Sequence, residues 1–268
     1  DYVAPVFSPC RKIVVIHDNL FWKYPQNYPL LWRIYFIKLI KLGLSINANI
    51  VTTSIYSKNG LKKIFNNKKI NHIYQSSERI HYNNKKNRSK HYILHIGTFE
   101  ERKNLLTLVK SFKLFKDNTN SNHKLVLAGS KYINGKKNVY KSIIKYLLKN
   151  NLTSSIIMPG YIKKKQAVYY YNNAFVYVFP SLDEGFGIPL IEAMRARVPV
   201  ICSDIEIFKE IGGDSVIYFK NQDHNDLYNK LKLILENKTV SRDLILKAKK
   251  RADLFNQKNF IKGFEKLY

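Results

Sequence analysis

Cysteine is scarce in this chain, and long uninterrupted hydrophobic runs are missing from it. Cys10 and Cys202 are the only cysteines among 268 residues, so neither a disulfide scaffold nor a cysteine-based zinc site is expected. The longest apolar stretches fall well short of the roughly 18 residues that a membrane-spanning helix needs. Hydrophobic residues still make up 45% of the chain, which is typical of a globular protein rather than a disordered one.

Acidic residues are few as well. The chain carries 19 Asp and Glu against 46 Lys and Arg, a formal net charge of +27. One explanation is attraction to an anionic partner such as a lipid surface or phosphorylated substrates. The other is compositional bias, because Lys, Asn, Ile, Tyr and Phe are all abundant together. The lysines are spread over the whole chain, which argues against a nucleic-acid-binding protein but leaves both explanations of the charge open.

The first 75 residues alternate between strand and helix patterns. Expected strands lie at 12–17, 49–53 and 69–74, and expected helices at 30–44 and 54–65, the second capped by Ser54. Such alternation predicts a parallel sheet and a Rossmann-like domain over 1–75. Residues 76–90 are polar without a clear period, which is typical of an interdomain linker.

A second alternating series predicts a doubly wound α/β domain over 91–255. Expected strands lie at 92–96, 124–128, 156–158, 174–179, 198–202 and 215–219, with helices at about 104–115, 139–150, after 163, from 189, 225–236 and 241–255. In such a domain the ligand site lies beyond the carboxyl ends of the strands. The segment 256–268 is amphipathic, and we expect it to form a C-terminal helix.

The stretch 174–196 combines a buried strand, a glycine loop and a helix that begins near Pro189. This arrangement points backbone N–H groups and a positive helix end at an anion. Glu184 lies in the loop and Glu192 lies one turn into an otherwise apolar part of the helix. A buried carboxylate needs hydrogen-bond donors, which ligand hydroxyls would supply. A carboxylate that only stabilises the helix N-terminus is the alternative.

Charged or titratable residues in two further segments each allow two interpretations. Arg102 and Lys103 precede a helix that starts near Asn104, where cations are unfavourable unless an anion lies nearby. A bound phosphate would be that anion, whereas ordinary surface cations are equally consistent with so basic a chain. His17 ends a strand of the first domain, where it is either a residue facing a cleft or a structural histidine.

In combination, these segments resemble the family-4 retaining glycosyltransferases of the GT-B fold, and in particular the surface-polysaccharide branch often called mannosyltransferase-like. The resemblance runs from about Lys12 to Tyr268, and Glu184 and Glu192 match the Glu-x7-Glu signature. The other matching segments are Gly97 with 101–104, 127–129, 159–161, 179–181, 184–189, 192–194 and 199–201. The fold implied is two Rossmann-like, doubly wound parallel-sheet domains. The first, over 1–75, would be incomplete and on the acceptor side, and the C-terminal helix at 256–268 would pack back toward it.

The resemblance implies transfer of a hexose from a nucleotide-diphosphate sugar to a polysaccharide or lipid-linked saccharide, with retention of the anomeric configuration. The family needs neither a cofactor nor a divalent metal. The resemblance also implies a cytoplasmic protein, peripheral on the inner, anionic face of a membrane. The alternative is a non-catalytic remnant that binds only a nucleotide sugar or a partner subunit.

The site residues follow from the matching positions. Lys103 corresponds to the lysine on the donor diphosphate, Glu192 to the glutamate on the ribose and Glu184 to the glutamate on the sugar. His17 corresponds to the first-domain histidine that faces the transferred sugar. The remaining donor-binding positions are Gly97 at the strand end, Arg102 beside the lysine, Tyr161 near the base, and the backbone N–H groups of Gly185, Phe186 and Gly187.

Four departures from the family pattern stand out. Thr98 occupies a position where arginine is common, so Arg102 is expected to supply the second positive charge. Arg197 and Val198 replace the small residue or glycine usual before Pro199. The aromatic residue often found near the last helix is not at 256–257. The family's first strands and glycine-rich loop do not precede Lys12, so an N-terminally truncated member is expected.

Overall fold

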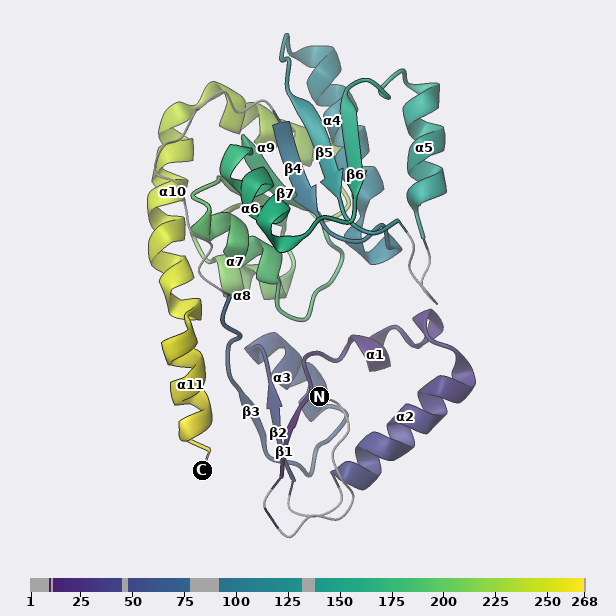
Figure 1. The fold of residues 1–268 in the computed structure, drawn as a ribbon, viewed down its shortest axis with the longest axis vertical. Coiled ribbons are helices and arrows are strands. Elements are labelled where there is room, and N and C mark those ends of the chain that lie inside the picture. Colours follow the sequence, from purple (N-terminus) through teal and green to yellow (C-terminus); the bar gives the residue numbers. More distant parts are fainter. Residues whose placement is uncertain (1–9, 11, 45–47, 78–91, 132–137, 268) are drawn as a thin grey trace. The chain divides into compact units, whose positions relative to one another are not determined.

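The computed structural model describes residues 10, 12–44, 48–77, 92–131 and 138–267, so most of the expected linker at 76–90 lies outside the described residues. The chain divides into two compact units, each described by itself (Figure 1). The smaller unit comprises Asp1–Ser76, Glu184–Gly187 and Phe255–Tyr268. The larger unit comprises Ser77–Asp183 and Ile188–Leu254.

The larger unit is built on a parallel sheet of six strands in the order β6-β5-β4-β7-β8-β9. The strands are β4 (Tyr92–Ile96), β5 (Lys124–Ala128), β6 (Ile156–Gly160), β7 (Val176–Phe179), β8 (Val200–Ser203) and β9 (Ile217–Phe219). Their central members are almost entirely apolar because both faces of the sheet are covered. The predicted doubly wound sheet is confirmed, and β4 and β5 match the expected strands to the residue.

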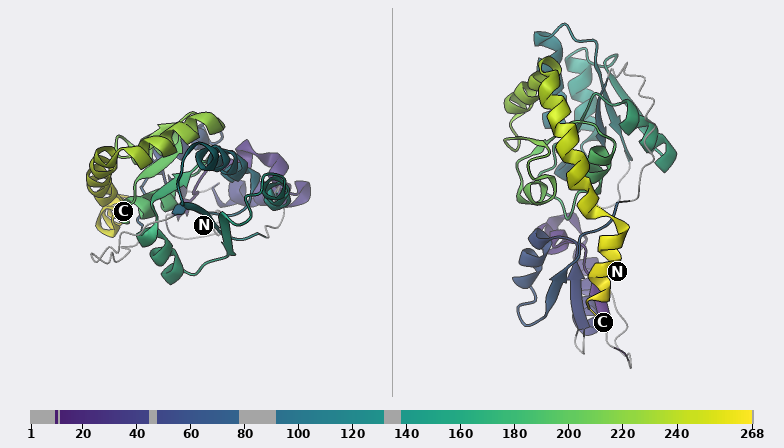
Figure 2. Two further views of the ribbon diagram at one scale, coloured as in Figure 1. Left: turned by 90° about the horizontal axis from the view of Figure 1, so that it is seen from above. Right: turned by 90° about the vertical axis from the view of Figure 1, so that its left-hand side faces the viewer.

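Helices lie on both sides of this sheet (Figures 1 and 2). Side chains of α4 (Leu105–Asn118), α5 (Tyr140–Lys149) and α9 (His224–Glu236) share one buried cluster with alternate residues of the strands. On the other face Tyr171 of α6 (Lys164–Asn173) contacts the ring of Tyr177, and Phe208 of α8 (Glu206–Gly212) contacts Phe179. Helices α7 (Ile188–Arg195) and α10 (Lys238–Ala252) pack against each other.

The order of the strands reverses at β4. From β4 the chain adds β5 and β6 on one side, then returns to place β7, β8 and β9 on the other. The connections leave β4 and β7 toward opposite sides, so a crevice is expected outside the carboxyl ends of these two strands. The loops after β4 and β7 contain most of the expected donor-binding residues.

Two glycines allow the ends of β4 and β5 to approach closely. Gly129 has a φ of 153°, and a Cβ there would lie 1.9 Å from the carbonyl oxygen of Gly97. Any larger residue at position 129 would therefore push the two strand ends apart. This close approach sets the path of the chain from Gly97 into the loop after β4.

The smaller unit has a parallel sheet of three strands in the order β1-β2-β3. Its strands are β1 (Lys12–Val15), β2 (Ala48–Thr52) and β3 (Ile70–His72), and its helices include α1 (Leu20–Lys23), α2 (Leu30–Gly43) and α3 (Ile55–Lys62). Ile40 of α2 and Leu61 of α3 pack onto Val14 and Ile50 of the sheet. The predicted cap of α3 is confirmed, since Ser54 Oγ accepts from the Ser57 N–H at 3.0 Å.

Residues far apart in sequence complete the smaller unit. The rings of Tyr74, Phe186 and Phe255 contact one another, with centroid separations of 5.5–6.1 Å. In α11 (Gln257–Glu265), Gly263 lies so close to Ile73 that a Cβ would come within 2.7 Å of its Cγ2. An aromatic residue is thus present near the last helix, at Phe255 rather than at 256–257.

Several short elements were not expected. They are α1, α8 and the 3-10 turns Pro25–Asn27, Glu101–Lys103 and Asp253–Phe255, each too short to show a helical period. Helix α10 begins earlier than expected because Asn237 caps it, accepting from the Val240 N–H at 3.1 Å. Within the described ranges, no helix is both long enough and apolar enough to span a bilayer.

Candidate functional site

Lys103 lies at the point where the strand order of the larger unit reverses. It ends the 3-10 turn Glu101–Lys103 that follows β4, and only 8% of it is exposed. Its Nζ lies 5.2 Å from the ring centroid of Phe179, the last residue of β7. An ammonium group over an aromatic face is stabilised by the ring quadrupole. A positive charge is therefore held between the carboxyl ends of the two strands that border the expected crevice.

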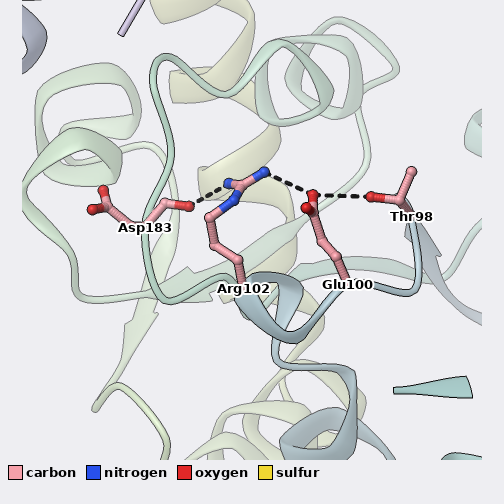
Figure 3. Close-up of polar contacts among 4 residues, drawn as sticks. All are labelled: Thr98, Glu100, Arg102 and Asp183. Carbon is pink, nitrogen blue, oxygen red and sulfur yellow. Dashed lines mark hydrogen bonds and ion pairs between the residues drawn. The ribbon is translucent and has the colours of Figure 1, made fainter. Parts of the chain in front are cut away.

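Arg102 makes contacts within its own chain that the sequence did not reveal. Its Nη2 lies 2.8 Å from Glu100 Oε1, and its Nη1 donates to the backbone carbonyl of Asp183 at 2.5 Å (Figure 3). Thr98 Oγ1 donates to the same Glu100 oxygen at 3.0 Å. The anion expected near these cations is thus, for Arg102, a carboxylate of the protein. In the sequence, the Glu100–Arg102 pair could have been suspected because an acidic residue lies two positions before an arginine in a chain with few acidic residues.

Glu192 lies on α7 and has a partner inside the protein. Its Oε2 accepts from the hydroxyl of Tyr171 at 3.0 Å, and the same hydroxyl lies 3.3 Å from the carbonyl of Pro189. Burial raises the pKa of Glu192, opposed by the bond from Tyr171 and by the charge of Lys164. Burial also raises the pKa of Tyr171, so this hydroxyl stays protonated and donates. Sequence reasoning missed Tyr171, which lies 21 positions from Glu192.

Gly97 and Tyr161 occupy different parts of the larger unit. Gly97 directly follows β4 and donates its N–H to the carbonyl of Ala128 at 2.9 Å. Tyr161 directly follows β6 and is 77% exposed. Because β5 separates β6 from β4, Tyr161 lies at the edge of the sheet rather than at the reversal point.

In the smaller unit, His17 is anchored at the end of the first strand. Its carbonyl accepts from Thr53 Oγ1 at 2.7 Å, and its ring Nδ1 lies 2.8 Å from Gln75 Nε2. Burial lowers the pKa of His17, against the opposing charge of Asp18, so the imidazole is neutral near pH 7. With Gln75 donating to Nδ1, the ring proton lies on Nε2.

The loop Glu184–Gly187 is held by hydroxyl groups of the smaller unit. The carbonyl of Gly185 accepts from Ser54 Oγ at 3.0 Å and from Ser57 Oγ at 3.1 Å. This carbonyl shares a planar trans peptide with the N–H of Phe186, so the two serines also fix the direction of that N–H. A Cβ at position 185 would lie 2.7 Å from the Cβ of Asp18, so only glycine fits there without a shift of the backbone or of Asp18.

The expected site residues are divided between the two units. The larger unit contains Gly97, Arg102, Lys103, Tyr161 and Glu192, and the smaller unit contains His17, Glu184, Gly185, Phe186 and Gly187. Within the larger unit, Arg102 and Lys103 each reach the end of β7 or the segment that follows it. Among the residues that the structure describes, no group of three or more His, Cys, Asp or Glu side chains could hold a metal ion.

Known proteins share much of this chain. It is 27% identical over 226 residues to the O-antigen chain mannosyltransferase RfbU of Salmonella typhimurium, which covers 84% of this chain and 61% of that protein. It is 34% identical over 124 residues to the O-antigen chain mannosyltransferase B of Escherichia coli, which covers 46% of this chain and 31% of that protein. The chain therefore spans less than two thirds of the length of these relatives.

Solved structures share the fold. The sucrose-phosphate synthase of Thermosynechococcus elongatus superposes with a TM-score of 0.80 at 23% identity, covering 96% of this chain and 66% of that one. WaaG, a glycosyltransferase involved in lipopolysaccharide biosynthesis, superposes with a TM-score of 0.76 at 13% identity, covering 96% and 74%. With two parallel α/β sheets, these neighbours confirm the predicted GT-B fold.

The family follows from the model that matches the larger unit. The model for glycosyl transferases group 1 matches residues 76–251, well over half of the chain. The matched range includes the loops after β4 and β7, together with Lys103, Arg102 and Glu192. The predicted resemblance to surface-polysaccharide glycosyltransferases is thereby confirmed, and the chain belongs to the glycosyl transferases group 1 family.

Proposed function

We propose that this chain acts as a retaining glycosyltransferase. It would move a hexose from a nucleotide-diphosphate sugar to a polysaccharide or lipid-linked saccharide. The observation that carries the proposal is Lys103, a buried cation held against Phe179 at the reversal point of a doubly wound sheet. Open α/β sheets bind nucleotides at this point. The two relatives named O-antigen mannosyltransferases favour mannose as the hexose and a surface polysaccharide as the product.

In the proposed reaction the bond between the anomeric carbon and the diphosphate oxygen breaks. The electron pair leaves with the diphosphate. An acceptor hydroxyl attacks the anomeric carbon on the face that the diphosphate leaves, which retains the configuration, and its proton passes to an oxygen of the departing diphosphate. Negative charge develops on the leaving diphosphate, so the ammonium group of Lys103 stabilises the transition state more than the ground state. The proposal assigns this charge compensation to the protein and requires neither a cofactor nor a divalent metal.

The other residues bind or orient the donor. Glu192 accepts from the ribose hydroxyls, with Tyr171 holding one of its oxygens. Glu184 contacts the transferred sugar, and the N–H groups of Gly185, Phe186 and Gly187 face the sugar and phosphate. His17, neutral and protonated on Nε2, faces the sugar as a hydrogen-bond donor. Gly97 leaves room for the diphosphate, and Tyr161 flanks the base.

The test is a binding screen of nucleotide-diphosphate sugars, beginning with GDP-mannose, followed by transfer assays with and without EDTA. We expect one donor to bind in the micromolar range and Lys103→Ala to lower transfer by about 10²- to 10³-fold. The control is Lys110→Ala on α4, which removes a similar charge elsewhere in the larger unit. Binding without transfer in the intact protein would favour a nucleotide-sugar-binding protein. Equal activity of Lys103→Ala and wild type would refute the site.

The proposed location is the cytoplasm, peripheral on the inner face of a membrane. On α2 the side chains of Leu30, Leu31, Ile34 and Tyr35 are exposed, and Lys38 and Lys41 are exposed on the same helix. Apolar residues combined with cations on one helix fit an anionic lipid surface. We expect co-sedimentation with anionic but not neutral vesicles. Leu31→Asp should reduce it, and Leu246→Asp, at an exposed position of α10, should not. Equal sedimentation with both vesicle types would indicate that the net positive charge of the chain reflects compositional bias rather than membrane binding.

A further inference from the structure

Arg102 joins two segments that are 80 residues apart in the sequence. Its backbone carbonyl accepts from the Leu182 N–H at 2.8 Å, and its side chain donates to the carbonyl of Asp183. Arg102 therefore holds the segment after β7 with both its main chain and its side chain. Asp183 itself is only 2% exposed, and it directly precedes Glu184 in the chain.

The direction of the guanidinium group is set by Glu100. This carboxylate is 5% exposed, and a carboxylate so far from water is tolerated only with hydrogen-bond donors around it. Two donors are Arg102 Nη2 and Thr98 Oγ1, which meet at Oε1 (Figure 3). Because the guanidinium is planar and rigid, fixing Nη2 on Glu100 also fixes the direction of Nη1 toward Asp183.

We propose that Glu100 and Arg102 are positioning residues that lock the loop after β7 to the turn after β4. The network Thr98–Glu100–Arg102–Asp183 sets where the chain enters Glu184, and it holds the turn that carries Lys103. This inference rests on the proposed function, and it assigns to Arg102 a role other than the expected second charge on the diphosphate. Transfer would then also depend on Glu100.

The rival role for Arg102 is direct contact with the diphosphate, and the two roles differ in what Glu100 does. If Arg102 binds the diphosphate, removing the nearby negative charge in Glu100→Gln leaves nucleotide affinity unchanged or strengthens it. If Arg102 is a clamp, Glu100→Gln loosens the loop and lowers transfer although every positive charge is still present. A direct phosphate contact also weakens as salt is raised, whereas an internal clamp is much less sensitive.

The first experiment measures amide hydrogen exchange over residues 182–184 and needs no substrate. We expect exchange there to rise at least about tenfold in Arg102→Ala and in Glu100→Gln, because local opening becomes easier. The control, Arg242→Ala, removes an exposed arginine of α10 and should leave exchange unchanged. The exchange result shows whether Arg102 and Glu100 hold residues 182–184, even if the proposed transfer activity is not found.

The second experiment separates turnover from binding. We expect Glu100→Gln and Arg102→Lys each to lower kcat for transfer by about 10- to 100-fold, since small displacements of reacting groups are costly. Affinity for the free nucleoside diphosphate should stay within about threefold of wild type. The double variant should lose little more than either single one, because both changes break one network.

Two outcomes would overturn the inference. One is unchanged exchange over 182–184 in both Arg102→Ala and Glu100→Gln. The other is a salt-dependent loss of nucleoside diphosphate affinity in Arg102→Ala together with normal turnover in Glu100→Gln. That result would show that Arg102 contacts the diphosphate directly. Thermal unfolding of each variant identifies a general loss of folding, and Glu100→Gln, which is nearly isosteric, is the variant expected to fold normally.

Discussion

The two units of this chain treat their apolar side chains differently. In the larger unit, helices cover both faces of the sheet, and residues such as Phe112 and Ile201 are completely buried. In the smaller unit, α2 places Ile40 in the core while Leu31 is 82% exposed. An apolar side chain stabilises a fold only where it leaves water. The buried residues of the larger unit therefore stabilise its fold, whereas the exposed side chains of α2 contribute only when something covers them.

The largest expected effect breaks the core of the larger unit. Phe112→Ala should lower the free energy of unfolding by about 3–5 kcal/mol, because it removes a buried ring and leaves a cavity. Leu31→Ala on α2 should change it by less than about 0.5 kcal/mol. Urea unfolding followed by circular dichroism measures both. A cost for Leu31→Ala approaching that of Phe112→Ala would show that the face of α2 is covered in solution.

The second effect concerns the carboxylate of the larger unit. Because burial raises the pKa of Glu192 above its ordinary 4.5, ionisation occurs at higher pH than in the unfolded chain. The contribution of this group to stability therefore falls as pH rises from 4.5 through the raised value. If Glu192 binds the ribose as proposed, nucleotide affinity should change in the opposite direction and rise with pH. The ionised carboxylate accepts from both ribose hydroxyls, whereas the protonated form has lost one acceptor oxygen.

Calorimetric titration of a nucleoside diphosphate across pH 4.5–8 tests this prediction. Wild type should gain about tenfold in affinity relative to Glu192→Gln as the carboxyl ionises. The ionisation of the ligand is common to both proteins and cancels in the ratio. If the affinities of wild type and Glu192→Gln change with pH in parallel, Glu192 does not bind the nucleotide.

The smaller unit should respond to pH in the opposite direction. Burial lowers the pKa of His17 below 6.5, so the unfolded chain takes up the proton first as pH falls. Stability attributable to His17 should therefore be complete above pH 6.5 and decline as pH drops below it. The measurement is the difference in unfolding free energy between wild type and His17→Gln at pH 7 and pH 5. A difference that grows on acidification would contradict the neutral imidazole.

The smallest expected effect lies in the larger unit. Arg197 has a φ of 50°, the left-handed region that glycine adopts without strain. The left-handed conformation fits the small residue or glycine that the family resemblance implies before Pro199. Arg197→Gly should raise the free energy of unfolding by up to about 1 kcal/mol, measured by thermal melting, with Arg242→Gly on exposed α10 expected to lower it. A loss of stability in Arg197→Gly would show that contacts of the arginine side chain outweigh the backbone strain.

The sequence predicted well what depends on local patterns. Strand β4 was predicted correctly because its ends are marked by polar residues and a glycine, and α3 because Ser54 is an effective cap. Lys103 was a candidate because it follows a buried strand and precedes a helix, and Glu192 because it is a carboxylate in an otherwise apolar part of a helix. These features require only near neighbours in the sequence.

Contacts between distant segments could not be predicted in this way. The bonds from Arg102 to Asp183 and from Tyr171 to Glu192 join residues 81 and 21 positions apart, and each depends on how loops or helices meet in the folded unit. Glu100 was overlooked because its role exists only once Arg102 is oriented. The chemistry of single residues is therefore visible in the sequence, whereas their mutual support is not.

The aromatic cluster of Tyr74, Phe186 and Phe255 has a consequence for the order in which the protein is made. Its three rings come from three separate segments of the smaller unit, and the last of them, Phe255, is synthesised only after every residue of the larger unit. The sheet of the smaller unit is synthesised first, yet its packing is completed last. The smaller unit therefore cannot complete its aromatic cluster until the whole of the larger unit has been synthesised.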